Sequence, residues 1–338
     1  MRITALAGGI GGARFLRGLR EHLAGGAGGD HPAGPAEITV VVNTADDITL
    51  HGLRVCPDLD TVMYTLGGGI HESQGWGRDD ERFTLAEELA AYGSQPQWFT
   101  LGDRDLATHI VRTRMLGLSY SLSQVTQSLC ARWQPGVRLL PMSDDQVETH
   151  VVIDDPEAEG GLRAVHFQEW WVRLHAAVPA RRILAVGIES ADPAPGVLEA
   201  IREADVVLLP PSNPVVSIGT ILGVPGVREA LRTTDAPVVG VSPIIDGAPV
   251  RGMADACLTA IGVETSAAAV AGLYADFLDG WLVDQRDGER AGARLAADHP
   301  GLAVRARALL MTDLPATAEI AGAALDLALS LGAASAAR

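Results

Sequence analysis

The stretch Ile3-Thr-Ala-Leu-Ala-Gly-Gly-Ile-Gly-Gly-Ala-Arg-Phe-Leu16 decides the fold, because it joins an apolar run, a glycine loop and the start of an amphipathic pattern. Residues 3–7 predict a buried strand, and residues 13–23 carry apolar side chains at helical spacing. A second apolar run follows at 38–42. Two buried strands joined through a helix predict a right-handed βαβ unit in a parallel sheet.

A second series of the same kind lies in the C-terminal half. The predicted strands are 183–188, 206–209 and 238–241, and the helices between them are 196–204 and 226–232. Beyond residue 255 helical patterns dominate, apart from 281–283 and 302–311. We therefore predict an α/β fold with a Rossmann-like, three-layer core around a parallel sheet.

The middle of the chain has a different pattern, which predicts an insertion of helices followed by a β-hairpin. The expected helices lie near 84–92, 105–116 and 121–133, and the alternating segments of the hairpin at 146–153 and 162–170. We predict that residues 1–74 and 179–338 form a nucleotide-binding core and that 75–178 form an inserted cap subdomain. The Gly/Ala/Pro-rich residues 25–35 are expected to be a surface linker.

The composition excludes several kinds of chemistry. The 338 residues include 26 arginines and no lysine against 42 acidic residues, which gives a net charge of −16. Without lysine, a Walker A lysine and a Schiff base are excluded, so arginine, a metal or backbone N–H groups must hold any phosphate. An acidic chain repels nucleic acid, whereas small anionic substrates with a divalent cation fit.

Cysteine usage and the N-terminus indicate the compartment. Three widely spaced cysteines support neither a disulfide framework nor a zinc site. The chain starts without a basic leader, and we find no apolar run long enough for a membrane span of about 18 residues. We expect a cytoplasmic protein that does not bind membranes.

The glycine loop is a candidate phosphate site. Gly9, Gly11 and Gly12 precede a helix whose free N–H groups favour an anion, and Arg14 in its first turn would contact phosphate oxygens. The dinucleotide spacing G-x-G-x-x-G is broken, because Arg14 stands where the third glycine is needed. A purely structural tight turn is the alternative.

Four carboxylates follow the second predicted strand. Asp46 and Asp47 come directly after it, and Asp58 and Asp60 follow within fifteen residues. Crowded carboxylates require a cation, and hard oxygen ligands near phosphates suit Mg²⁺. The alternative is helix capping by Asp58 or Asp60.

A rigid loop after another predicted strand offers polar groups to a second anion. Ser212, Asn213 and Ser217 lie among three prolines. Arg104, just ahead of a predicted helix, would recognise an anion or a heterocycle if it faces a cleft, although an ordinary capped helix explains it too. Trp76, flanked by glycines, is a candidate cover for a planar ligand.

Eight segments in chain order resemble the 2-phospho-L-lactate transferase family (CofD, called FbiA in actinobacteria) of coenzyme F420 biosynthesis. They are Gly8-Gly-Ile-Gly-Gly-Ala-Arg-Phe15, Asn43-Thr-Ala-Asp-Asp47, Pro57-Asp-Leu-Asp-Thr-Val-Met-Tyr64, Gly102-Asp-Arg-Asp-Leu-Ala-Thr-His109, Leu140-Pro-Met-Ser-Asp-Asp145, His166-Phe-Gln-Glu-Trp170, Pro211-Ser-Asn-Pro-Val-Val-Ser-Ile218 and Val241-Ser-Pro-Ile-Ile245. The resemblance runs from residue 1 to about 312, and the residues of these motifs look most like those of the actinobacterial branch.

The resemblance implies a Mg²⁺-dependent transferase. Family members move a phosphoenolpyruvyl or 2-phospho-L-lactyl group from a guanosine-diphosphate-activated donor to the ribityl 5′-hydroxyl of the deazaflavin Fo, releasing GMP. We favour the enolpyruvyl donor on branch resemblance. A homodimer is expected by analogy. Two alternatives stay open: a non-catalytic nucleotide or nucleotide-sugar regulator on the same fold, and an NAD-dependent oxidoreductase, which the broken glycine spacing disfavours.

The resemblance also assigns roles to residues. Asp46 and Asp60 would be the first metal ligands and catalytic groups, with Asp47 and Asp58 as alternate ligands or as acceptors for the Fo ribityl chain. Fo would contact the residues Asp58, Asp60, Arg104 and Trp76. The guanosine donor would contact the residues Gly9, Gly11, Gly12, Arg14, Asn43, Thr44, Ser212, Asn213 and Ser217.

Overall fold

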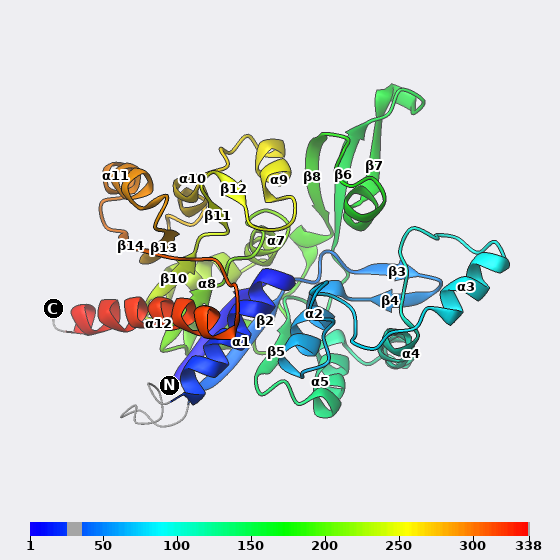
Figure 1. The fold of residues 1–338 in the computed structure, drawn as a ribbon, viewed down its shortest axis with the longest axis horizontal. Helices are drawn as coiled ribbons and strands as arrows, with labels where there is room; N and C mark the ends of the chain where they lie inside the picture. The colour runs from blue at the N-terminus through cyan, green and yellow to red at the C-terminus, as the bar shows by residue number, and fades with distance from the viewer. Residues whose placement is uncertain (26–35, 337–338) are drawn as a thin grey trace.

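A parallel sheet forms the centre of the molecule in the computed structural model, which describes residues 1–25 and 36–336 (Figure 1). Within these residues the sheet has seven strands in the order β14-β13-β10-β9-β1-β2-β5. Their bounds are β1 Arg2–Ala7, β2 Glu37–Val42, β5 Arg138–Pro141, β9 Val206–Leu209, β10 Val238–Val241, β13 Gly280–Asp284 and β14 Ala303–Arg307. The predicted α/β fold with a parallel core is confirmed.

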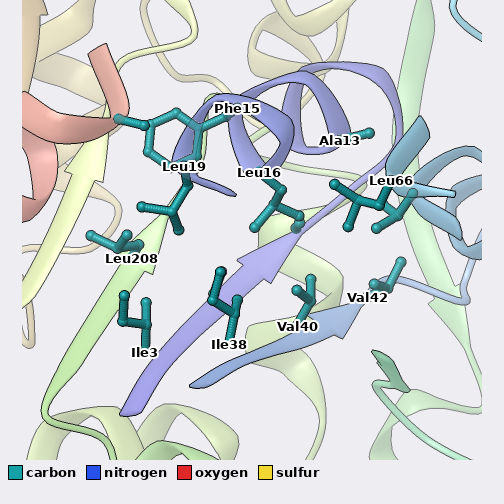
Figure 2. Packing of buried hydrophobic residues seen from close by; sticks show 14 of the residues in the cluster. Ile3, Ala13, Phe15, Leu16, Leu19, Ile38, Val40, Val42, Leu66 and Leu208 are labelled. Atoms are coloured by element: carbon teal, nitrogen blue, oxygen red, sulfur yellow. The ribbon is translucent and has the colours of Figure 1, made fainter. Parts of the chain in front are cut away.

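Helices cover both faces of this sheet because its inner strands bury side chains on both sides. Val40 and Val42 of β2 pack with α1, α2, α5 and α12, whereas Val41 packs with α6, α7, α8 and α10. Figure 2 shows Leu16 and Leu19 of α1 above Ile38. The bounds are α1 Ile10–Ala24, α2 Pro57–Leu66, α5 Leu122–Trp133, α6 Val197–Arg202, α7 Ile218–Gly223, α8 Val227–Thr233, α10 Ala267–Gly272 and α12 Leu314–Ala336.

Helix α12 corrects one expectation from the sequence. Its segment Leu314–Ala333 is long and apolar enough to cross a membrane by length and composition, although no such run was predicted. The helix lies beside α1, and Ile320, Ala324 and Ala328 are buried in the same core as that helix. Glu319, Asp326 and Ser330 interrupt the apolar residues, so the sequence indicates a helix here but no continuous apolar run, and the helix buries one side in the core.

A second, smaller sheet stands beside the central one and corrects another prediction. Residues 183–188 were expected in the parallel core, but β8 Ala180–Val186 pairs antiparallel with β6 Glu148–Asp154. The predicted hairpin is present, since β6 also pairs antiparallel with β7 Leu162–His166. The strand ends at His166 rather than at residue 170, because Glu169–Arg173 form a short π-helical turn, η2.

The remaining elements surround these two sheets. They are the hairpin β3 Ile48–Leu50 and β4 Leu53–Val55, the pair β11 Ile244–Ile245 and β12 Ala248–Pro249, α3 Thr84–Ala91, α4 Asp103–Gly117, α9 Ala254–Ala260, α11 Gly288–Asp298, and the short turns η1 Glu159–Gly161 and η3 Ile188–Ser190. The domain boundaries stay a prediction. Strand β5, inside 75–178, lies in the central sheet, and the small sheet takes β8 from the segment assigned to the core. The predicted linker lies outside the described residues except for its first residue.

Candidate active site

The loops that follow β1, β2 and β9 meet at the carboxyl edge of the central sheet. Ala7 of β1 lies opposite Val42 of β2, so the glycine loop and the acidic turn start side by side. Strand β9 flanks β1 on its other side, and the Gly8 N–H donates a hydrogen bond of 3.0 Å to Ser212 Oγ. The structure thus brings together the three loops that the sequence singled out, at the edge where open α/β sheets bind ligands.

The glycines of the first loop are needed for close packing. A Cβ on Gly9 would lie 2.5 Å from Asp58 Oδ1, and one on Gly11 would overlap the Pro211 carbonyl oxygen. Helix α1 begins at Ile10 without a side-chain cap or an acid in its first turn. Its first N–H groups are therefore available to an anion. The close packing also fits the alternative that the loop is a purely structural tight turn.

Asp46 and Asp58 form a buried pair of like charges. Burial and the Asp58 carboxylate raise the pKa of Asp46 well above its usual value. Burial likewise raises the pKa of Asp58 to about 6, although Asn43 and the Gly9 backbone stabilise its charged form. Asn43 Nδ2 donates to Asp58 Oδ2 at 3.0 Å, and the Thr220 hydroxyl holds the Asn43 amide oxygen at 2.7 Å.

Asp47 is fully buried next to this pair. Burial raises its pKa to about 7, although Arg54 favours the charged form. Arg54 Nη2 lies 3.5 Å from Asp47 Oδ2 and its Nη1 lies 3.5 Å from Glu148. Arg54 was not among the residues predicted from the sequence, where a lone arginine in a short hairpin carries no signal.

Asp60 lies in a separate buried ion pair. Both of its oxygens accept hydrogen bonds from Arg112 of α4, with Nη1 at 3.0 Å from Oδ2. His109 continues the network, with Nδ1 at 3.7 Å from Asp60 and Nε2 at 3.3 Å from Asp105, which accepts a bond from the Tyr64 hydroxyl. The network ties α2 to α4, and sequence reasoning missed Arg112 because 52 residues separate the partners.

The carboxylates at the sheet edge suit a divalent cation in part. Within the described residues, Asp46 Oδ1 and both oxygens of Asp47 are buried without a hydrogen-bond partner. No group of three His, Cys, Asp or Glu side chains in residues 1–25 and 36–336 forms a ready metal site. Mg²⁺ commonly takes only one or two carboxylates together with waters and substrate phosphates. Asp46 and Asp58 fit that mode, whereas Arg112 occupies both oxygens of Asp60.

Two arginines meet beside the start of α1. Arg14 Nη2 and Arg251 Nη1 lie 3.8 and 3.1 Å from the position of a Cβ on Gly75. Among the described residues neither has a carboxylate partner. The Arg251 guanidinium lies 5.7 Å from the centre of the Trp76 ring, and that ring is 53 % exposed. Sequence reasoning found Arg14 and Trp76 but missed Arg251, which comes from a distant loop.

Three polar residues predicted to contact the nucleotide make contacts within the protein. Asn213 Oδ1 accepts the N–H groups of Val215 and Val216, so its side chain shapes its own turn. Ser217 and Thr44 are buried, Ser217 against Gly8.

Arg104 is half exposed at the start of α4. Its guanidinium lies 3.8 Å from the Asp80 carboxylate, and its backbone N–H donates to the Glu81 carboxylate at 2.8 Å. It neighbours Asp105, which the His109 network links to Asp60. The roles predicted for these residues stay predictions.

Comparisons with known proteins agree with this architecture. The sequence profile described as "2-phospho-L-lactate transferase CofD" matches residues 3–305. Proteins called "Phosphoenolpyruvate transferase" are similar over nearly their whole length: that of Thermobifida fusca is 66 % identical (98 % of this chain, 99 % of that protein), and that of Mycolicibacterium smegmatis is 57 % identical (97 % and 99 %). A solved Bacillus halodurans structure of the UPF0052 family has a TM-score of 0.58 at 18 % identity, covering 96 % of this chain and 98 % of that one. It shows the fold alone.

Proposed function

Because the chain belongs to the 2-phospho-L-lactate transferase CofD family, we propose that this transferase acts in coenzyme F420 biosynthesis and moves a phosphoenolpyruvyl group from a guanosine-diphosphate-activated donor to the ribityl 5′-hydroxyl of Fo. The products are dehydro-F420-0 and GMP. The names of the similar actinobacterial proteins support the enolpyruvyl donor over the 2-phospho-L-lactyl donor, which would give F420-0.

One observation carries the proposal. Asp46 and Asp58 are interacting carboxylates with no arginine partner among the described residues, next to a glycine loop that opens a helix. An acidic pair alone repels a diphosphate, but a cation held by the pair attracts one. Because the chain has no lysine, we expect a metal at this carboxylate pair and the N–H groups at the start of α1 to bind the phosphate groups together.

The residues of the site divide the work as follows. Asp46 and Asp58 would hold Mg²⁺, and Asp60 anchors α4 through Arg112 instead of binding the metal. The backbone of the glycine loop and Ser212 bind the donor's phosphates. The nucleotide also contacts the residues Gly9, Gly11, Gly12, Arg14, Asn43, Thr44, Asn213 and Ser217, and Fo contacts Arg104 and Trp76.

The reaction exchanges one oxygen–phosphorus bond for another. The 5′-hydroxyl oxygen of Fo attacks the phosphorus that carries the enolpyruvyl group, and the bond from that phosphorus to the bridging oxygen breaks. GMP leaves with the bridging oxygen, and an aspartate of the acidic turn accepts the hydroxyl proton. When bound, Mg²⁺ would neutralise negative charge on the diphosphate and on the leaving GMP. The protein's part is positioning and a fixed electrostatic environment.

The decisive experiment incubates the protein with Fo, Mg²⁺ and each donor in turn and identifies products by mass spectrometry. Dehydro-F420-0 and GMP from the enolpyruvyl donor are expected. If the protein binds guanosine nucleotides but neither binds Fo nor forms product, the transferase proposal is wrong. The alternative, a nucleotide-binding regulator on the same fold, would then be favoured. We further propose a cytoplasmic homodimer acting only on small molecules, which sedimentation and cell fractionation test.

A further inference from the structure

The second sheet holds three consecutive backbone carbonyls of the acidic turn. The Thr149 N–H of β6 donates to the Ala45 carbonyl at 2.6 Å. Gln168 Nε2 lies 3.3 Å from the Asp46 carbonyl oxygen, and His166 Nε2 lies 3.1 Å from that of Asp47. These bonds cross from one sheet to the other, because residues 45–47 follow β2 of the central sheet. They determine where the backbone of both aspartates lies.

The hydrogen bonds of His166 define its protonation. The Gln168 N–H donates to His166 Nδ1 at 3.1 Å, so that nitrogen is an acceptor. The ring hydrogen is then on Nε2, which donates to the Asp47 carbonyl. A neutral imidazole and a primary amide are both uncharged donors. They hold the turn without neutralising the carboxylates themselves.

Both donors stand on a rigid support. Gln168 is buried, and its neighbours Phe167 and Trp170 are buried in a core of the second sheet, with their ring centres 6.0 Å apart. Trp170 Nε1 donates to the Val178 carbonyl at 2.8 Å, which fixes the turn that follows. A side chain whose surroundings are packed this way loses little further freedom when it holds a partner.

The acidic turn needs such support because its side chains repel one another. Within the described residues, Asp46 Oδ1 and both oxygens of Asp47 are buried without a hydrogen-bond partner. Without an external hold, the turn would relax by moving its carboxylates apart. Backbone bonds that do not depend on charge keep them together before a cation arrives.

We infer that His166 and Gln168 are positioning residues, which clamp the backbone of Asp46 and Asp47 so that the carboxylates at the sheet edge are ready for a divalent cation. The inference rests on the proposed function for the identity of that cation. It gives a physical reason for the segment His166-Phe-Gln-Glu-Trp170, which the proposed reaction leaves without a role.

The test compares variants that remove one donor each. His166→Leu and Gln168→Met remove the N–H groups, whereas His166→Gln places an amide near the position of Nε2. The matched control is His150→Gln, because His150 lies opposite His166 on β6 but has its ring nitrogen next to Glu148. Mn²⁺ serves as the probe, and its affinity is measured by electron paramagnetic resonance. Hydrogen exchange of a peptide spanning residues 43–48 is measured on the same metal-free proteins, with melting temperature as the check on folding.

A clamp predicts a specific pattern. Mn²⁺ affinity falls roughly 10- to 100-fold in H166L and Q168M, the range typical for residues that orient metal ligands. H166Q recovers most of the affinity, and H150Q matches the wild type. The 43–48 peptide exchanges faster in H166L and Q168M alone.

Three outcomes decide against the inference. Unchanged affinity and unchanged exchange in folded H166L and Q168M overturn it, and so does an equal loss in H150Q, which would indicate a general effect of the second sheet. If the wild-type chain binds no Mn²⁺, the metal assignment of the proposed function fails. Faster exchange in H166L and Q168M then still supports the clamp, and unchanged exchange overturns it.

Discussion

Replacing Arg112 by methionine tests whether Asp60 is an anchor or a ligand. Both side chains are buried, and the two oxygens of Asp60 are held by the one guanidinium. Arg112→Met leaves the carboxylate in a low-dielectric site beside His109 and near Asp105, without its cation. Breaking a buried pair by removing one partner costs about 3–5 kcal/mol. A typical domain has only ~5–15 kcal/mol of stability in total, so the loss is large.

The assay is urea unfolding followed by circular dichroism, on the wild type, R112M, D60N and the double variant D60L/R112M. Each single variant leaves one buried polar or charged group without its partner and is expected to lose several kcal/mol, about the cost above. The double variant replaces both groups by apolar side chains of similar size and should recover most of the stability, because such replacements are often neutral. The non-additivity measures the coupling between the two residues.

The same double variant separates the two roles of Asp60. If Asp60 is an anchor, folded D60L/R112M binds Mn²⁺ as the wild type does. If Asp60 is a metal ligand, the affinity falls although the fold is intact. A loss of less than about 1 kcal/mol in R112M, the value of an exposed pair, would refute the reasoning from burial.

Three further predictions concern the rest of the site. In metal-free protein, burial raises the pKa of Asp47 from 3.8 to about 7, so the native state keeps a proton there that the unfolded chain releases. The contribution of this proton to the free energy of unfolding is lost as pH rises from about 4 to 7. Melting temperatures measured in chelator should therefore depend less on pH in D47N than in the wild type. Arg251→Ala should weaken GDP binding measured by calorimetry, because Arg251 lies beside Arg14 at the start of α1. The control Arg17→Ala, which removes an exposed ion pair with Glu72, should not weaken it. Equal GDP affinities of the wild type and both variants would contradict a phosphate site at these arginines. Gly11→Ala should lower both the GDP affinity and the melting temperature, because the new Cβ would overlap the Pro211 carbonyl oxygen. The control Gly292→Ala lies in open space on α11 and should raise the free energy of unfolding by about 0.5–1 kcal/mol. An unchanged melting temperature in Gly11→Ala would count against the close packing of the loop.

Local sequence patterns were sufficient to predict the sheet edge. An apolar run followed by glycines and another followed by Asn43, joined through a helix, predict neighbouring parallel strands, and parallel strands end at one edge of the sheet. The meeting of Gly8 and Asn43 follows from this topology, whereas Ser212 reaches them because β9 pairs with β1, which the sequence did not specify.

The location of residues 183–188 did not follow from their pattern. A short apolar run fits a strand buried in the core and a strand of a small sheet equally well, because periodicity does not report the pairing partner. The pairing of β8 with β6 decides it, and that partner lies more than 25 residues away along the chain. Strand β5 was missed because Arg138 and Pro141 leave it only two consecutive aliphatic residues, whereas the equally short β9 is aliphatic throughout.

The division of labour among the four aspartates was hidden for a related reason. In the sequence they form two similar pairs, and any of them could be a ligand. Arg112, the partner of Asp60, lies 52 residues away along the chain, and Arg54 reaches Asp47 because the hairpin of β3 and β4 turns the chain back. Pairing that depends on the folded path of the chain leaves no local signal, unlike the i,i+4 contacts of a helix.

Pairing by arginine leaves the negative charge of the site unevenly distributed. Asp60 has a full guanidinium partner and Asp47 shares one with Glu148, whereas the Asp58 carboxylate raises the pKa of Asp46. An added cation gains most where the charge is least compensated, because there it relieves repulsion as well as forming new contacts. Each arginine also removes an aspartate from competition for that cation. If the proposed function holds, the two ion pairs would therefore direct a divalent ion towards Asp46 and Asp58, on the side of the acidic cluster that borders the glycine loop.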